Sequence, residues 1–243
     1  MSLLVMKEPN ADQGQFPRTR WTMIQRAGKG SSQDLESLCA QYWYPLYAFA
    51  RRSGSGSEDA EDLTQMFIAK LIAKHWVEQA HGEDCTFRSF LLVRFKRFLK
   101  DERVKGQALK RGGDEAHVTI HRDDAEERYA AEPVDGKMTP DALFDRAWAT
   151  ALLDRALESL RAEFTDSGKA LEFQALQPCL SWNENTRTYK QIAGDIGREE
   201  SWVKVAVNRM RRRYRKLLEH EVADTVPAAN VEEEMETLHR ALR

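Results

Sequence analysis

The chain has 243 residues, which is enough for one large domain or two small ones, each with its own hydrophobic core. Apolar residues make up 42% of it and charged residues 31%, a balance typical of globular proteins that excludes a membrane-embedded one. Lys and Arg number 37 against 39 Asp and Glu, and a net charge of −2 taken alone argues against a nucleic-acid partner.

The N-terminal segment and the cysteines predict a cytoplasmic protein. The chain begins with a short apolar stretch that no basic residue precedes and an acid soon follows, unlike a secretory signal. Cys39, Cys85 and Cys179 lie tens of residues apart, which matches neither a metal site nor a disulfide framework. We therefore expect free thiols, no bound metal, no cofactor and no membrane span.

The first part of the chain predicts helices. Residues 1–30 are expected to form an N-terminal extension, and residues 31–111 the first of two small helical domains in an all-α fold. The segment YWYPLYAF (42–49) is rich in aromatic residues and is expected to lie in the core of that domain. Two glycines in SGSGS (53–57) then predict a turn between helices.

A cluster of acids opens the next predicted helix, residues 57–74. We call Glu58, Asp59, Glu61 and Asp62 the acidic cluster, and expect Ser57 to be the N-cap. Acids in a first turn suit the helix dipole, but four neighbouring ones repel each other and indicate a basic partner. The alternative is a solvated helix end. The apolar side contains Leu63, and the opposite side is expected to expose Asp59, Asp62 and Gln65.

Aromatic and basic residues alternate along the predicted helix over 87–111. Eight bases and two acids lie between Arg94 and Arg111. Helical spacing places Lys96, Lys100 and Arg103 on one side with Arg97 beside them, and we call these four the 96–103 basic face. Rings among cations suit unpaired DNA, which stacks its bases on rings. We expect Phe90, Leu91 and Phe98 in the core, and Trp76 and Phe87 as candidate ring contacts.

A linker and a second domain follow. Residues 112–139 are polar, open with two glycines and predict a flexible linker. In the second domain, residues 140–222, Thr188 is expected to cap a short helix that Gly197 ends before a second helix begins. A small residue at Ala193 and a glycine four positions later are what the tight turn of a helix-turn-helix needs.

The second helix of this pair carries seven bases and no acid between Lys204 and Lys216. Such a run is costly unless a polyanion is near, although a solvated amphipathic helix is the simpler alternative. Opposite its apolar stripe lies what we call the 201–215 face. Its Asn and first bases are expected to read base edges, and its later arginines to hold phosphates. Its members are Ser201, Lys204, Asn208, Arg211, Arg212 and Arg215.

The tail, residues 223–243, is acidic and contains a short amphipathic helix over 231–242. It is expected either to cover a basic face of one domain or to remain a solvated helix. The net charge near zero is therefore the sum of basic and acidic segments and does not exclude a nucleic-acid partner.

These motifs together resemble the bacterial RNA polymerase sigma factors of the extracytoplasmic-function type. The resemblance rests on YWYPLYAFARR (42–52), EDAEDLTQMFIAKLI (58–72), FRSFLLVRFKRFLKDER (87–103) and TYKQIAGDIGREESWVKVAVNRMRRRYRKLL (188–218). Arg97 and Glu199 depart from the family, which commonly has Asn and a capping Ser there.

The resemblance implies a protein that is not an enzyme, binds core RNA polymerase and directs transcription initiation at specific promoters. Asp59, Asp62, Leu63 and Gln65 would dock on the clamp helices of the β′ subunit. The 96–103 basic face would hold the minus-10 promoter element, and the 201–215 face would read the minus-35 element. The second domain would also touch the β-flap, and an anti-sigma factor is a common further partner.

Other functions remain open from the residues alone. A stand-alone helix-turn-helix regulator would bind duplex DNA, usually as a dimer, and would not need the acidic cluster. A polymerase-bound regulator would keep the acidic cluster without needing the 201–215 face. A hydrolase that acts on nucleic acid is a remote third alternative, because the sequence does not indicate carboxylates gathered in a polar pocket.

Overall fold

The computed structural model describes residues 22–79, 86–108, 125–132, 138–180 and 187–243, and across these ranges it contains helices and no strand, which confirms the predicted all-α class. The helices are α1 (Thr22–Gly28), α2 (Ser32–Arg52), α3 (Ser57–Ala73), α4 (Phe87–Ala108), α5 (Ala125–Ala131), α6 (Pro140–Asp166), α7 (Ala170–Leu176), α8 (Tyr189–Ile196), α9 (Glu200–Ala223) and α10 (Val231–Ala241). Short 3₁₀ turns, η1 (Trp76–Gln79), η2 (Gln177–Leu180) and η3 (Ala228–Asn230), complete the described elements.

Helix α2 lies at the centre of the larger of two hydrophobic cores. Its aromatic residues are buried as predicted, with Trp43 1% exposed and stacked on Tyr47 at a centroid distance of 5.4 Å. Phe67 of α3 and Phe95 of α4 pack edge to face at 4.9 Å on the same core. Large rings in this arrangement bury much apolar area, so this larger core is expected to supply most of the stability of the chain.

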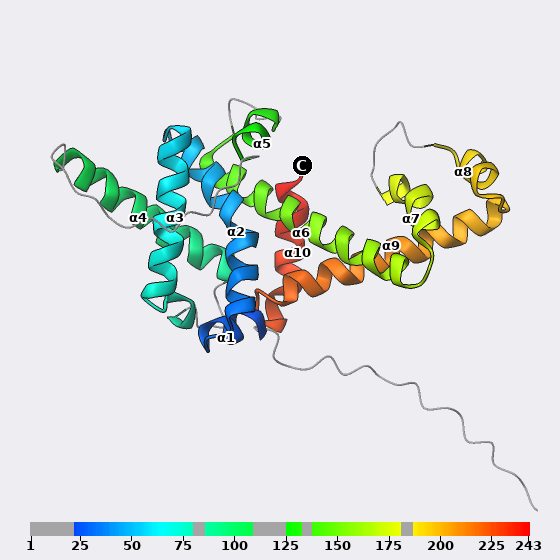
Figure 1. The fold of residues 1–243 in the computed structure, drawn as a ribbon, viewed down its shortest axis with the longest axis horizontal. Helices are drawn as coiled ribbons and strands as arrows, with labels where there is room; N and C mark the ends of the chain where they lie inside the picture. The colour runs from blue at the N-terminus through cyan, green and yellow to red at the C-terminus, as the bar shows by residue number, and fades with distance from the viewer. Residues whose placement is uncertain (1–21, 80–85, 109–124, 133–137, 181–186) are drawn as a thin grey trace, which may run out of the picture.

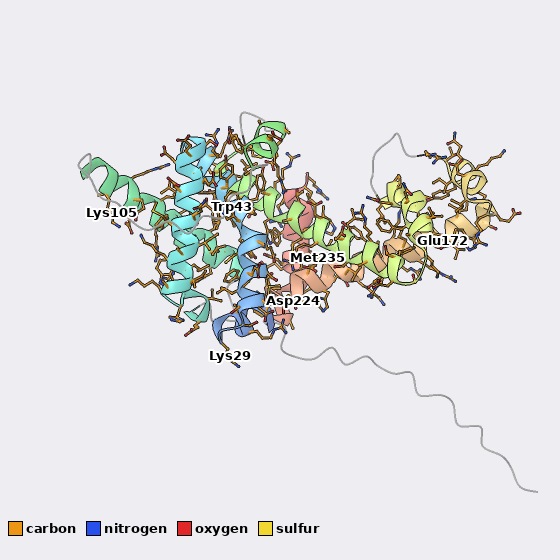
Figure 2. The ribbon with its side chains drawn as sticks, in the orientation of Figure 1. Lys29, Trp43, Lys105, Glu172, Asp224 and Met235 are labelled. Carbon is orange, nitrogen blue, oxygen red and sulfur yellow. The ribbon has the colours of Figure 1, made fainter. Side chains whose placement is uncertain are left out.

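The smaller core lies where α7 and α8 pack against the ends of two long helices, at the right of Figure 1. Its fully buried residues are Leu160, Phe173, Leu176, Cys179, Ile192, Ala193, Val203, Val207 and Met210. Figure 2 places the labelled Glu172 in this part and Trp43 and Met235 in the larger one.

Helices α6 and α9 run through both cores without a break. On α6, Ala156 belongs to the larger core and Leu160 to the smaller one; on α9, Met210 belongs to the smaller core and Leu218 to the larger one. The buried residues therefore divide within these two helices. The sequence predicts instead that the two domains are divided at a linker over 112–139. The two cores are joined because the apolar stripes of α6 and α9 are longer than either core.

The predicted linker also contains structure. Helix α5 packs on α2 through Glu126, which accepts hydrogen bonds of 2.7 and 2.9 Å from the guanidinium of Arg51 and a further one from the Tyr47 hydroxyl. Arg128 lies over the ring of Tyr44 at 3.9 Å, and Ala125 is buried. Residues 125–131 are thus held on the larger core, which the lack of apolar periodicity in this acidic segment did not indicate. The rest of the predicted linker up to residue 137 lies mostly outside the described residues.

Both predicted terminal extensions contribute to the larger core. Met23 and Ile24 of α1 are 5% and 2% exposed, so the boundary at residue 30 falls inside a packed region. At the other end, Met235 and Leu238 of α10 are 8% and 1% exposed against α6 and α9. The tail is therefore neither a solvated helix nor a separate acidic segment.

Candidate nucleic-acid interface

Helices α8 and α9 form the predicted pair with its tight turn. The Thr188 side chain accepts from the backbone N–H of Gln191, whose side chain accepts from the Thr188 N–H at 2.9 Å, a complete capping box. Gly197 ends α8 with φ = 63°, a left-handed conformation that favours glycine, and Ala193 is 5% exposed where α8 meets α9. The predicted roles of these residues in the local fold are confirmed.

The N-cap of α9 is not one of the usual capping residues, Ser, Thr, Asp or Asn. Its N-cap is Glu199, which makes no hydrogen bond from its side chain to the helix, and the helix begins at Glu200. Ser201 therefore lies in the first turn and is exposed. The first backbone N–H groups of α9 consequently have no side-chain cap from this position.

The predicted 201–215 face lies on α9, and we call it the α9 face from here on. All six of its side chains are exposed, while Val203, Val207 and Met210 on the opposite side are buried. The face is nevertheless less uniformly available than its sequence predicts. Both nitrogens of the Arg211 guanidinium donate to the carbonyl oxygen of Cys179, at 3.1 and 2.7 Å, so Arg211 anchors α9 to η2. Arg212 and Asn208 have no hydrogen-bonding partner within the described ranges of the chain.

Acids neutralise part of the basic run on α9. Lys204 pairs with Glu200 at 2.8 Å and Arg215 with Glu219 at 2.9 Å, both across one helical turn. Arg213 pairs with Glu163 of α6. The premise that all seven bases are uncompensated is therefore wrong, because neighbours outside the run supply carboxylates. Arg209, Arg212 and Lys216 lack an acidic partner among the residues that are described.

The 96–103 basic face, from here on called the α4 basic face, extends from the middle of α4 toward the C-terminal part of the helix, where Lys105 is labelled in Figure 2. All four of its side chains are exposed. Lys96 pairs with Asp141 at the start of α6, and Arg103 donates to the carbonyl oxygen of Ser53 at 2.6 Å. Arg97 and Lys100 have no acidic partner in the part of the chain that the structure describes.

A groove of about 630 Å³ runs beside the α4 basic face. Trp76 is half-buried in its wall and carries the Arg94 guanidinium over its ring at 5.0 Å. Lys74 and Arg97 also line the groove. Asp101 and Glu102 line it as well, but cations outnumber acids. Cations around a partly exposed ring suit an unpaired base and its phosphates. Phe87, in contrast, is 1% exposed and packs edge to face on Tyr42, so its predicted role as a ring contact is wrong.

The acidic cluster lies at the start of α3 and is largely exposed. Gly56 is the N-cap, one residue before the predicted Ser57. Glu58, Asp59 and Asp62 are exposed and have no basic partner within the described residues, whereas Leu63 is half-buried against the larger core. Gln65 is 7% exposed and hydrogen bonded to Glu61, so its predicted place on the exposed side is wrong.

The acidic tail does not cover either basic face. Helix α10 packs on α6 and α9 at the larger core, and its Glu234, 2% exposed, accepts from Arg88 at 2.8 Å. Arg88 also pairs with Asp145 of α6 and lies over the ring of Trp148 at 4.9 Å. Burial raises the pKa of Asp145, which Arg88 opposes. This buried cluster joins α4, α6 and α10.

Among the described residues, no group of three or more His, Cys, Asp or Glu side chains is placed to hold a metal ion, and no helix has the length and apolarity to cross a membrane. Comparisons of the chain with known protein families, with curated proteins and with solved structures find no match in any of the three.

Proposed function

We propose that this chain is a sigma factor that binds core RNA polymerase and directs it to specific promoters. The observation that carries the proposal is that one chain holds two different surfaces suited to DNA: the exposed face of a helix that follows a tight turn, and a mainly basic groove with a partly exposed ring. The first suits duplex DNA and the second suits an unpaired strand.

The two surfaces suggest a division of work. Asn208 and Lys204 near the start of α9 would read base edges in the major groove, and Arg212 and Arg215 would hold phosphates. Beside α4, an unpaired base would lie near Trp76 while Arg97 and Lys100 follow the backbone. Unstacking a base costs a few kcal/mol, which contacts in this groove would offset without nucleotide hydrolysis.

Two other surfaces would bind the polymerase. The exposed acids of the acidic cluster suit the basic clamp helices of β′, with Leu63 beside them and Gln65 beneath the surface. A groove of about 710 Å³ beside α9, lined by Trp202, Val205 and Ala206 among others, offers an apolar site for the β-flap.

The first test is binding to core polymerase. Asp62→Lys places a cation among the acids that would meet β′, and we expect at least a tenfold loss of affinity in a pull-down with purified core enzyme. Glu236→Lys on the exposed side of α10 makes the same change of charge elsewhere and should leave binding unchanged. Equal binding by both variants would refute the docking surface.

The second test is promoter use. Arg212→Ala should lower transcription from a cognate promoter and DNA affinity while core polymerase still binds, since Arg212 is exposed and has no partner among the described residues. Arg240→Ala in the tail is the matched control. A chain that binds a duplex tightly and ignores core polymerase would instead be a stand-alone helix-turn-helix regulator, as would a chain in which the α4 basic face can be neutralised without effect.

A further inference from the structure

The first turn of α9 carries an acid and a base that are already paired. The carboxylate of Glu200 lies 2.8 Å from the ammonium of Lys204, one turn further along, and their side chains are 44% and 57% exposed. The hydrogen bond from Lys204 lowers the pKa of Glu200, so this carboxylate remains ionised at neutral pH. An acceptor and a donor thus lie side by side at the end of the helix that the proposed function places in DNA.

An acid in the first turn of a helix suits the helix dipole, but one that faces DNA also needs a hydrogen-bond donor there. In helix-turn-helix proteins the first residues of the second helix approach the base edges, between two rows of phosphates that repel a carboxylate. In the major groove, only the amino groups of cytosine and adenine donate hydrogen bonds to such a group. Glu200 would therefore favour DNA that presents one of these amino groups and disfavour all other DNA.

The spacing of the pair matches one base pair. In a C·G pair the cytosine amino group and the guanine O6 are joined by a Watson–Crick hydrogen bond, so they lie about 2.9 Å apart. The Glu200 oxygen and the Lys204 nitrogen are 2.8 Å apart with the opposite polarity. Resting on the proposed placement of α9 in the major groove, we infer that Glu200 and Lys204 together read one C·G base pair, with cytosine on the Glu200 side.

The groups that flank these atoms select C·G over the alternatives. Guanine N7 lies next to O6 and gives the ammonium a second acceptor, whereas the thymine methyl lies next to O4. Adenine N7 lies next to its amino group and repels a carboxylate, whereas cytosine has no acceptor there. A reversed G·C pair would set acceptor against acceptor. The orientation of the base pair is therefore fixed as well as its identity.

Glu199 provides the matched control. It lies one residue earlier, is exposed, and makes no hydrogen bond to the helix from its side chain. No lysine pairs with it in the described structure, so its carboxylate has no adjacent donor with which to match a base pair. Replacing it changes the local charge by the same amount without removing the acceptor and donor pair.

The test is selection of bound duplexes from a randomised pool by the full chain, alone and with core polymerase, followed by sequencing. We expect one position at which cytosine is enriched. With Glu200→Gln, whose amide suits adenine, the preference for cytosine at that position should fall about tenfold and shift to adenine. Exchanging the two residues, Glu200→Lys with Lys204→Glu, should enrich guanine there instead. Glu199→Gln should select the same sites as the natural chain, and circular dichroism verifies that each variant folds.

The outcomes separate the two proposals. Enrichment of a motif that neither Glu200→Gln nor the exchange alters would refute the reading of a C·G pair and leave the sigma-factor proposal intact. Failure of the natural chain to enrich any motif, with or without core polymerase, would refute both. A shift at the same position with Glu199→Gln would also refute the reading of a C·G pair, because the negative charge alone would then explain the preference for cytosine.

Discussion

The two cores of this molecule differ in how they are built. The larger one contains most of the buried aromatic residues and an ion-pair cluster, and helices α1 to α6, α9 and α10 contribute to it. The smaller one has nine fully buried residues, one of them aromatic. A core of that size rarely supports a domain alone. The comparison indicates that the smaller core depends for its stability on the larger one. The connection runs through α6 and α9, which contribute buried residues to both cores.

The largest expected effect tests this dependence on α6. Trp148 is fully buried in the larger core beneath Arg88. Trp148→Ala should lower the free energy of unfolding by about 3–5 kcal/mol. If the smaller core depends on the larger one, unfolding in urea should remain a single transition. Circular dichroism and a spectroscopic probe attached to α8 should then report the same midpoint. Leu171→Ala, which changes a side chain 79% exposed on α7, should have little effect. Two separate transitions would show that the cores are independent.

The next effect tests the ion-pair cluster that joins α4, α6 and α10. Arg88→Met would leave the buried carboxylate of Glu234 and the half-buried carboxylate of Asp145 without their cation, at a cost of about 3 kcal/mol in unfolding free energy. A second change, Glu234→Leu, should recover part of the loss because it removes one of the unpaired charges. Additive losses in this double-mutant cycle would mean that the two residues are not coupled.

A smaller effect on unfolding is expected from a change in the smaller core. Gly197→Val places a β-branched residue at φ = 63° and should cost about 1–2 kcal/mol, with a matching loss of DNA affinity. Gly194→Ala is the control, since it lies on α8 with open space around its Cβ position and should be neutral or slightly stabilising. Equal melting temperatures for the two variants would show that the turn is not strained.

The smallest effect concerns acid stability at the edge of the larger core. Arg26 and Ser31 hydrogen bond to Asp34 and lower its pKa from 3.8 to about 2. Because this pKa is lower in the folded chain, the contribution to stability is present above pH 4 and is lost as the pH falls toward 2. Asp34→Asn should therefore flatten the pH dependence of the melting temperature over this interval. An unchanged profile would show that the pair contributes nothing.

Local features could be predicted well from the sequence. Thr188, Ala193 and Gly197 each act within a few residues, so their types alone indicate a cap, a close helix contact and a left-handed turn. The aromatic run of α2 is buried because no surface would expose so many rings at successive positions. The sides of α4 and α9 follow from helical spacing in the same way.

Features that depend on distant partners could not be predicted. The apolar stripe of α10 does not reveal whether it is covered or by which helix, and Arg88 lies 146 positions from Glu234. The acidic sequence of α5 predicts a flexible linker because the partner of Glu126, Arg51, lies far away in the sequence on α2. Similarly, no residue near Arg211 in the sequence indicates that Arg211 donates to the Cys179 carbonyl. No residue near Gln65 in the sequence indicates that this side of α3 is buried.

Helix α9 also has a consequence for the spacing of any DNA site. Its 24 residues form a rod about 36 Å long, close to one turn of the double helix. One end carries Glu200 and the other is fixed in the larger core by Leu218 and Val222. A flexible tether would absorb an inserted base pair at little entropic expense, whereas a rod held at one end must bend or release a contact. Under the proposed function, binding should therefore be sensitive to single base-pair changes in the separation of the two proposed DNA contacts.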